Sequence, residues 1–428
     1  MRKILFALLL VPAVASAGGY SLPNLTPRDL AMGDSLVADQ TTSGAVYRNP
    51  AALSRLSGLD LTLTLGLIGN GSTWTTTTGL NPSPVSTDLH LVPPVNFFAS
   101  WSGKVSGHGW GVGIGFNVPG GGNVFWPDGW AGQNTILSVD RKLYAGYLSA
   151  GFEIIPQIRV GGGVIYYYAA EKLTVNKALP GGSQGLVTLA DSGGQLSWDL
   201  SLEIQPLVGY PLRIAADYKQ QAFMTLKGPA NFAFPPAFAA AYPNQEFTHV
   251  LPYPSTFNVG IAWRPIPEVD VTAGYTFENY SVYVSDTFVG QTIDAATGSL
   301  LELSVWRKYS NANIYRLGVA WQALPVLEVR AGGLYDQSGV NPSYFNPSLP
   351  DAKAWCGSLG LGWNVLQDLQ LNAAFFNAWF QTLDSVPAPS TAALDNSSSF
   401  PGSFKNWAWI ASVGVNWKWD PQTKAAPK

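Results

Sequence analysis

The sequence has little of what a soluble protein of its length usually contains. Charged residues make up 12% of its 428 residues, about half of the usual fraction. Its one cysteine, Cys356, excludes an internal disulfide framework and gives no redox or metal motif. Beyond the first residues, no apolar run reaches the roughly 18 residues that a membrane helix needs. Any contact with lipid must therefore be made by strands.

The first 17 residues, MRKILFALLLVPAVASA, have the three parts of an export signal: two cations, an apolar run and a small-residue cleavage site. No lipoprotein cysteine follows, so we expect a mature chain that starts at Gly18. Removal of Arg2 and Lys3 leaves 22 basic residues against 27 acidic ones. This balance excludes nucleic acid as a partner.

Aromatic residues and glycine are abundant, with 16 tryptophans and 45 glycines, and apolar residues alternate with polar ones in run after run. In the stretch 269–277, every second residue from Val269 to Phe277 is apolar or aromatic. A period of two is typical of a strand with two different faces. Counting such runs predicts 14 strands, at 58–69, 91–102, 108–117, 135–155, 157–176, 195–205, 210–227, 246–263, 268–285, 300–322, 326–336, 352–365, 368–381 and 405–419.

The connections between these strands alternate in length. Tight turns rich in Pro or Gly alternate with long segments, which we place at 70–90, 118–134, 177–194, 228–245, 286–299, 337–351 and 382–404. An even number of antiparallel strands with this alternation predicts a barrel in a Gram-negative outer membrane, with short periplasmic turns and long outer loops. Tryptophans near strand ends, such as Trp101 and Trp379, fit the aromatic girdles of such a barrel. The alternative is a secreted soluble β protein, which is disfavoured because one face carries many Trp and Tyr and the other few charges.

The segment 18–57 precedes the first predicted strand and is too short and too polar to fold alone. Pro50 follows Arg-Asn and suits the first position of a helical turn. We expect this segment to lie inside the barrel, whose lumen must otherwise be filled with water. The predicted division is therefore a signal peptide at 1–17, a plug at 18–57, a barrel at 58–419 and a tail at 420–428.

Five motifs stand out along the chain: Arg28-Asp29-Leu30-Ala31-Met32-Gly33, Ala38-Asp39, Asn49-Pro50-Ala51-Ala52-Leu53, Leu251-Pro-Tyr-Pro-Ser255 and Asn346-Pro-Ser-Leu-Pro350-Asp351. Together they resemble the FadL/TodX family of outer-membrane transporters for hydrophobic compounds. The resemblance covers nearly the whole mature chain and implies a 14-stranded barrel closed by an N-terminal hatch, with Asn49, Pro50 and Ala51 as the hatch motif. The chain departs from the family at its end, because Trp419 is followed by nine more residues where an aromatic terminus is usual.

Transport of an apolar molecule requires an apolar surface that captures it outside the cell. Two predicted outer loops carry such side chains. These are Trp126 and Trp130 in one loop, and Phe232, Phe234, Phe238 and Tyr242 in the other. Dense apolar side chains on exposed loops are uncommon without a role, so we expect a capture groove there. The alternative is that the loops pack on each other above the barrel.

The third predicted strand has glycine at every second position: Gly109, Gly111, Gly113 and Gly115. Glycine inside a strand marks a bend, a bulge or a close backbone approach. In the family that the chain resembles, this strand is kinked and leaves a lateral opening in the wall. We therefore expect the opening at these glycines, and the alternative is that they make room for the hatch.

Charged residues on the lumen face are expected to form a network that positions the hatch; they are Arg213, Asp217, Lys219, Asp270, Glu278, Glu328 and Arg330. One of the cations could instead meet a fatty-acid carboxylate. No catalytic residue, metal site or cofactor is expected, because His90, His108 and His249 are scattered without metal-ligand spacing.

The predicted function is passive transport of fatty acids or hydrocarbons, with lateral release near the third strand. A general diffusion porin is the first alternative, and an outer-membrane lipid-modifying enzyme is the second. The expected partners are hydrophobic small molecules, outer-membrane lipid and lipopolysaccharide, and the barrel assembly machinery during insertion, with the chain acting as a monomer.

Overall fold

The first and last strands of the computed structural model pair with each other and close the sheet into a barrel. β1 (Gly58–Thr75) runs antiparallel to β21 (Gly402–Trp419), with a continuous register from Leu59↔Trp419 to Thr75↔Ser403. The structure describes residues 19–23, 26–77, 83–293, 300–385 and 400–420. The signal peptide expected at 1–17 and residues 421–428 of the expected tail lie outside this part of the chain.

The predicted fold class, a 14-stranded antiparallel barrel, is confirmed. Four of its strands consist of two consecutive segments each: β9 (Leu212–Lys219) with β10 (Ala222–Ala233), β11 (Gln245–Tyr253) with β12 (Thr256–Ile266), β13 (Val269–Glu278) with β14 (Ser285–Ile293), and β15 (Leu300–Trp306) with β16 (Ala312–Leu324). A fifth joins the short β3 (His90–Val92) to β4 (Val95–Val105). The remaining strands, besides β1 and β21, are β5 (His108–Phe125), β6 (Ser138–Ile155), β7 (Ile158–Ala178), β8 (Gln184–Ile204), β17 (Leu327–Asp336), β18 (Ala354–Leu366) and β19 (Leu369–Phe380). Two short strands pair with the outer ends of the closing strands: β2 (Val85–Ser86) with β1, and β20 (Leu383–Ser385) with β21.

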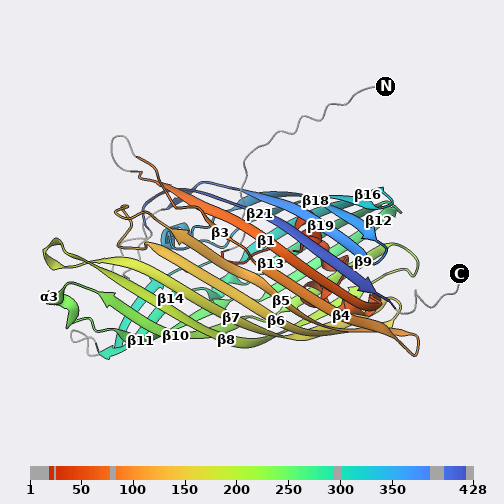
Figure 1. The fold of residues 1–428 in the computed structure, drawn as a ribbon, viewed down its shortest axis with the longest axis horizontal. Coiled ribbons are helices and arrows are strands. Elements are labelled where there is room, and N and C mark those ends of the chain that lie inside the picture. The colour runs from red at the N-terminus through yellow and green to blue at the C-terminus, as the bar shows by residue number, and fades with distance from the viewer. Residues whose placement is uncertain (1–18, 24–25, 78–82, 294–299, 386–399, 421–428) are drawn as a thin grey trace, which may run out of the picture.

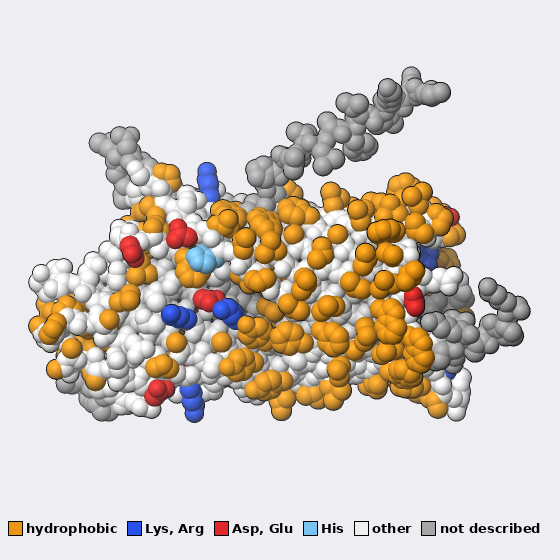
Figure 2. Space-filling view, in the orientation of Figure 1, with side chains coloured by type: hydrophobic (Ala, Val, Ile, Leu, Met, Phe, Trp, Pro, Cys, Tyr) orange, Lys and Arg blue, Asp and Glu red, His pale blue; other side chains and the backbone are white. Residues whose placement is uncertain are grey.

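Short turns gather at one end of the barrel and long connections at the other (Figure 1). Apolar side chains cover the surface over the end with the short turns, whereas charged side chains appear toward the other end (Figure 2). The exposed apolar residues include the tryptophans Trp101, Trp263, Trp321 and Trp379. This distribution places an apolar belt around the periplasmic part of the barrel and lets the strands project beyond it on the outside.

Several of the predicted long loops are wrong in extent, because β1, β5, β7, β8, β10 and β14 each extend into one of them. The segment 177–194 belongs mostly to a hairpin, because β7 and β8 pair as far as Ala178↔Gln184 and only η3 (Pro180–Gly182) lies in the turn. The glycines that suggested a loop are strand residues there, and a Cβ on Gly193 would lie 2.2 Å from the carbonyl oxygen of Thr225. The first residues of the segment 228–245 likewise continue β10 as far as Ala233. In both places glycine marks a close approach of two backbones and not the end of a strand.

Residues 26–57 form short helical turns inside the barrel, and together with residues 19–23 we call them the hatch. The turns are α1 (Pro27–Ala31), η1 (Leu36–Ala38), α2 (Ala45–Arg48) and η2 (Pro50–Arg55). Three further short turns lie outside the hatch: α3 (Pro236–Ala239), η4 (Tyr280–Val282) and η5 (Pro342–Tyr344). Most hatch residues are buried, and α1 begins with Pro27, whose fixed φ suits a first helical position.

No helix among the described residues is long and apolar enough to cross a membrane.

Candidate functional site

The hatch motif is buried against the inner wall of the barrel. The side chain of Asn49 has no exposed surface, and its Nδ2 donates a hydrogen bond of 2.9 Å to the carbonyl oxygen of Val37. The backbone N–H of Ala51 donates to Oγ of Ser201 on β8 at 2.8 Å. The motif therefore fixes the fold of the hatch and joins the hatch to the wall.

Glycines on the wall allow this close contact. A Cβ on Gly151 of β6 would lie 2.2 Å from the carbonyl oxygen of Pro50, and a Cβ on Gly161 of β7 would lie 2.2 Å from the backbone N of Ala51. Neither position has room for a side chain, because atoms that are not bonded do not approach so closely. The wall and the hatch motif are thus complementary at the level of the backbone.

Ion pairs join the hatch to the wall at the periplasmic side. Asp39 of the hatch accepts hydrogen bonds from Arg213 of β9 and from Arg28 of α1, the latter at 2.7 Å. Burial by itself raises the pKa of the Asp39 carboxyl, but the two guanidinium groups outweigh this effect and hold the pKa below its usual range. Glu328 of β17 lies 3.9 Å from Arg28 and pairs with Arg330 at 2.5 Å.

The other predicted lumen charges are less directly linked to the hatch. Asp217 and Lys219 pair with each other at 2.5 Å, and Lys219 Nζ lies 5.1 Å from the centre of the Tyr47 ring in the hatch. Asp270 pairs with Arg264 at 2.6 Å. Glu278 is buried and faces a small cavity beside the hatch. The network that positions the hatch stays a prediction, although Arg213 is in direct contact with it.

The four glycines of β5 face the hatch. A Cβ on Gly109 would lie 2.1 Å from the carbonyl oxygen of Ser54, and one on Gly111 would lie 2.5 Å from that of Leu53. Cβ atoms on Gly113 and Gly115 would similarly meet Val46 and Phe98. In this region β4 and β5 pair without a break, from Phe97↔Phe116 to Val105↔His108. The expected opening at these four glycines is therefore misplaced, since the wall is continuous there and the glycines make room for the hatch.

The wall is interrupted further along the same strand. The register of β5 with β6 shifts between Asn117 and Gly120, and the pairing of β5 with β4 ends at Phe116. Pro119 lies in this shifted segment, and proline cannot donate to a ladder. Beyond it, β3 pairs with β1 but has no ladder with β5 among the described residues.

The first described residues of the hatch run along this interruption. Leu22 N donates to the carbonyl oxygen of Pro119 at 2.9 Å, and Gly121 N donates to that of Tyr20 at 2.8 Å. Ser21 and Gly120 form an isolated antiparallel bridge. The N-terminal end of the hatch thus acts as a short substitute for the missing strand partner of β5.

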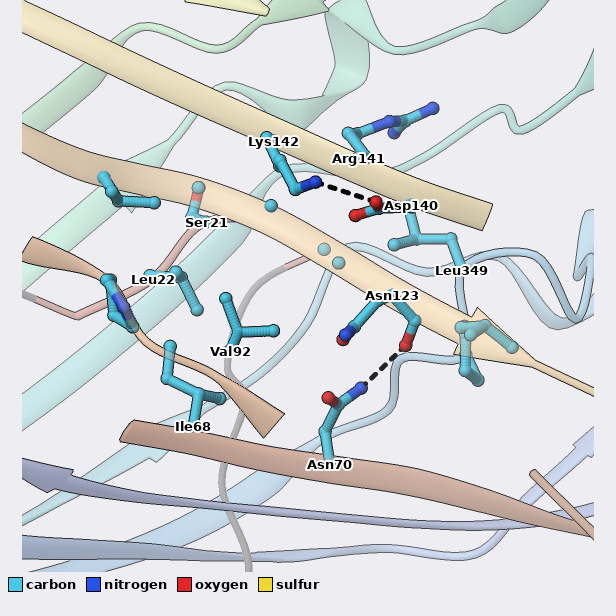
Figure 3. Close-up of a pocket in the computed structure, with 18 of the residues that line it drawn as sticks. Ser21, Leu22, Ile68, Asn70, Val92, Asn123, Asp140, Arg141, Lys142 and Leu349 are labelled. Carbon is cyan, nitrogen blue, oxygen red and sulfur yellow. Dashed lines mark hydrogen bonds and ion pairs between the residues drawn. The ribbon is translucent and has the colours of Figure 1, made fainter. Parts of the chain in front are cut away.

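A cavity of about 80 Å³ lies at this point (Figure 3). Apolar side chains from the hatch, from β1, from β3 and from the long loop before β18 line it, namely Leu22, Ile68, Val92 and Leu349. Asn70 Nδ2 of β1 donates to the carbonyl oxygen of Asn123 of β5 at 3.0 Å and spans the gap in the wall.

The sequence prediction missed this cavity, because it assigned residues 118–134 to a loop. Pro119 followed by three glycines inside an alternating run was the signal that could have found it.

The two predicted capture loops differ in structure. Trp126 and Trp130 stack at 4.2 Å between ring centroids and are only 4% and 3% exposed. They form part of a cluster with Trp74, Phe345 and Phe404. This pair therefore lies in a packed core above the barrel, which is the alternative to an open groove.

The aromatic residues of the second loop are only partly buried. Phe232, Phe234 and Tyr242 contact one another, with ring centroids 5.0 to 6.2 Å apart, and Phe238 is half-buried on α3. Phe232 and Phe234 also pack on a buried apolar cluster formed by Val187, Leu189, Ala230, Phe247 and Phe288. An apolar surface therefore runs from the loop to the upper wall of the lumen.

The histidines give no catalytic arrangement with a serine or cysteine among the described residues. His90 stacks on Phe125 at 3.7 Å, and His108 Nδ1 lies 3.1 Å from the carbonyl oxygen of Glu153. His249 is buried on β11 beside Asp191 and Glu171, a grouping that the sequence spacing did not indicate.

Comparisons with known proteins agree with this architecture. A family model described as outer membrane protein transport protein (OMPP1/FadL/TodX) matches residues 8–419. A Pseudomonas aeruginosa FadL homologue is similar in structure, with a TM-score of 0.80 and 15% identity over 94% of this chain and 99% of that one. The Pseudomonas putida toluene transporter TodX has a TM-score of 0.70 and 13% identity, over 95% of this chain and 100% of that one. The monoaromatic hydrocarbon channel CymD has a TM-score of 0.68 and 15% identity, over 94% of this chain and 99% of that one. No curated protein sequence matches significantly.

Proposed function

Because the chain belongs to the outer-membrane transport family of FadL and TodX, we propose that it releases hydrophobic molecules sideways through the interrupted wall at Asn117–Gly120. The family is one of transporters of hydrophobic compounds and not of enzymes. The single observation that carries the proposal is the apolar cavity beside the interruption, which lies between the lumen and a wall without a continuous ladder.

The route begins at the partly buried aromatic residues of the second outer loop. Phe232, Phe234 and Tyr242 offer an apolar surface to a molecule that arrives from outside, and they pack on the cluster that includes Phe247 and Phe288. Transfer along such a surface needs no energy source, because each step exchanges one apolar contact for another. The proposed ligand class is therefore a long-chain fatty acid or a hydrocarbon.

A sideways exit leaves the hatch in place. The hatch motif and the Asp39 ion pairs hold the hatch against β6, β7, β8 and β9, so complete removal would break many buried contacts. Among the described residues of the hatch, only Gly19–Leu22 borders the proposed exit. A small shift of this end is sufficient to widen the cavity toward the wall. The proposed setting is a monomer in outer-membrane lipid and lipopolysaccharide.

Two neighbouring residues of β3 provide the test. Val92 points into the cavity (Figure 3). Leu91 lies on the other face of the strand and is 51% exposed. Val92→Trp should fill the cavity and reduce uptake of labelled oleate and toluene by at least about tenfold, whereas Leu91→Trp should leave uptake near that of the wild type. Altered gel migration without boiling checks that both barrels have folded. Equal uptake by the two variants would contradict the lateral route.

Liposome swelling tests the porin alternative. The hatch occupies the lumen, which supports exclusion of hydrophilic solutes. Vesicles that contain the protein should not swell in sugars that pass through a general porin. Swelling at a porin-like rate would favour that alternative.

A further inference from the structure

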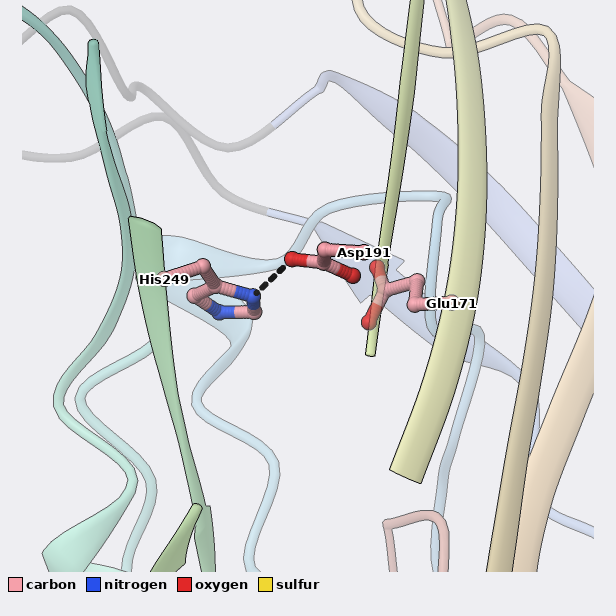
Figure 4. A group of neighbouring side chains, drawn as sticks. All are labelled: Glu171, Asp191 and His249. Atoms are coloured by element: carbon pink, nitrogen blue, oxygen red, sulfur yellow. Dashed lines mark hydrogen bonds and ion pairs between the residues drawn. The ribbon is translucent and has the colours of Figure 1, made fainter. Parts of the chain in front are cut away.

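We propose that Glu171 of β7, Asp191 of β8 and His249 of β11 bind a divalent transition-metal ion such as zinc. One ligand atom from each side chain lies within 4.8 Å of the other two, and the three side chains converge from separate strands (Figure 4). All three are buried, with 6%, 7% and 1% of their surface exposed. One imidazole and two carboxylates are a ligand set that suits zinc, with a water molecule at a fourth position.

The distance between His249 and Asp191 fits a shared ion. Nδ1 of His249 lies 3.3 Å from Oδ2 of Asp191. Two ligands that are each about 2.1 Å from a tetrahedral ion lie about 3.4 Å apart, whereas a direct N–H···O hydrogen bond is usually about 2.9 Å. Oε2 of Glu171 accepts from Arg141 Nε at 2.7 Å, and Oε1 has no hydrogen bond among the described residues. One oxygen of Glu171 is therefore free to take part.

The second nitrogen of His249 faces a carboxylate. Nε2 is buried without a hydrogen bond in the described part of the chain and lies 3.4 Å from Oδ1 of Asp286 on β14. Arg307 holds Asp286 in place at 2.7 Å, and Tyr283 donates to it at 2.7 Å. Metal-binding histidines commonly donate their other N–H to such a carboxylate, which sets the tautomer. Asp286 is thus placed to orient His249 with Nδ1 toward the ion.

The charges around the cluster leave a place for a cation. Glu171, Asp191 and Asp286 carry three negative charges, and Arg141 and Arg307 supply two positive ones at 2.7 to 3.7 Å. With a neutral His249, one negative charge remains uncompensated in a buried site, which is costly. A proton on His249 compensates it, whereas a zinc ion leaves a net charge of +1 that a hydroxide in place of water at the fourth position would balance, so the proton and the ion compete for the site.

The proposed ion lies beside a part of the wall where two neighbouring strands share a short ladder. Among the described residues, β11 and β14 pair only at Phe247↔Gly290, Thr248↔Val289 and His249↔Phe288. The ladder resumes between β12 and β13 at Thr256↔Glu278. An outer groove of about 550 Å³, lined by Phe223, Val250 and Val284, lies in between. An ion that joins β7, β8 and β11 would stabilise the wall where this ladder is short, beneath the apolar surface of Phe247 and Phe288.

Zinc binding to the full-length protein in detergent tests the proposal. After treatment with a chelator and dialysis, titration calorimetry and elemental analysis should show one zinc ion per chain. His249→Asn should remove this binding, and Asp286→Asn should weaken it by about 10- to 100-fold. His108→Asn is the matched control, because His108 lies on β5 away from the cluster and should leave binding unchanged.

A thermal measurement gives a second readout. Zinc should raise the unfolding temperature of the wild type and of His108→Asn, but not that of His249→Asn or Asp191→Asn, because an ion stabilises only the state that binds it. If His249→Asn does not fold, Asp191→Asn decides the matter. Absence of stoichiometric zinc in the wild type, or equal zinc binding by wild type and His249→Asn, would overturn the proposal and leave a cluster held together by a proton.

Discussion

Arg55 of the hatch binds Glu203 of β8 through two hydrogen bonds, with 2.5 Å between Nε and Oε1 and 3.1 Å between Nη2 and Oε2. The carboxylate of Glu203 is fully buried, so loss of its partner costs more free energy than loss of a partner in a surface ion pair. Arg55→Ala should destabilise the docked hatch by about 1–3 kcal/mol. Hydrogen exchange of the hatch amides in detergent should then become faster. Unchanged exchange would show that the hatch is held without this pair.

Glycine at position 111 is needed for the contact between β5 and the hatch. Gly111→Val would place a Cβ 2.5 Å from the carbonyl oxygen of Leu53, and overpacking of this kind costs roughly 1–3 kcal/mol. We expect increased cleavage of the hatch by protease while the barrel remains folded on a gel. Val112→Leu on the outer face is the control, because Val112 is 45% exposed. Equal protection of both variants would argue against the close contact.

A disulfide between the hatch and the wall should leave transport intact if the exit is lateral. Ser35 Oγ of the hatch and Thr272 Oγ1 of β13 are 2.6 Å apart, so cysteines at these two positions can reach each other. In a Cys356→Ala background, oxidised and reduced Ser35→Cys/Thr272→Cys protein should take up oleate at the same rate. A large loss of uptake on oxidation that is restored by reduction would mean that the hatch must leave the lumen.

The two aromatic loops should respond differently to truncation. Trp126→Ala removes a buried, stacked ring and should lower the stability of the outer cap by about 3–5 kcal/mol. Phe234→Ala removes a partly buried ring and should mainly reduce uptake at low ligand concentration. Thermal unfolding and concentration-dependent uptake separate the two effects. A Phe234→Ala variant with normal uptake at low concentration would exclude this loop from capture.

The sequence predicted the barrel because its signal is local and repeated. Alternation in runs such as 269–277 and breaks such as Pro156 each depend on a few neighbouring residues, and the barrel follows from their number and spacing. The burial of Trp126 and Trp130 is different, because it depends on Phe345 and Phe404, which lie more than two hundred residues away. The same limit hid the grouping of His249 with Glu171, which no sequence spacing indicates.

The glycines of β5 show how one local pattern can have two meanings. Sequence alone indicates that Gly109 to Gly115 need space, but it does not say whether the space is empty or filled by another backbone. The structure fills it with the hatch, and the interruption of the wall lies at Pro119. Whether the space is empty or filled depends on a contact between the hatch and β5, which are separated by the whole of β1 and β4 in the sequence.

The long ladder between β1 and β21 also has a consequence for biogenesis. β21 is the last strand in the described part of the chain, whereas the hatch precedes every strand. The hatch contacts the inner wall from β5 round to β21, so we expect it to be enclosed by the sheet before β1 and β21 pair. In a chain permuted to begin at β5, the hatch would follow most of the strands, and we expect its entry into the partly formed barrel to be slower. The natural order of the chain avoids that topological problem.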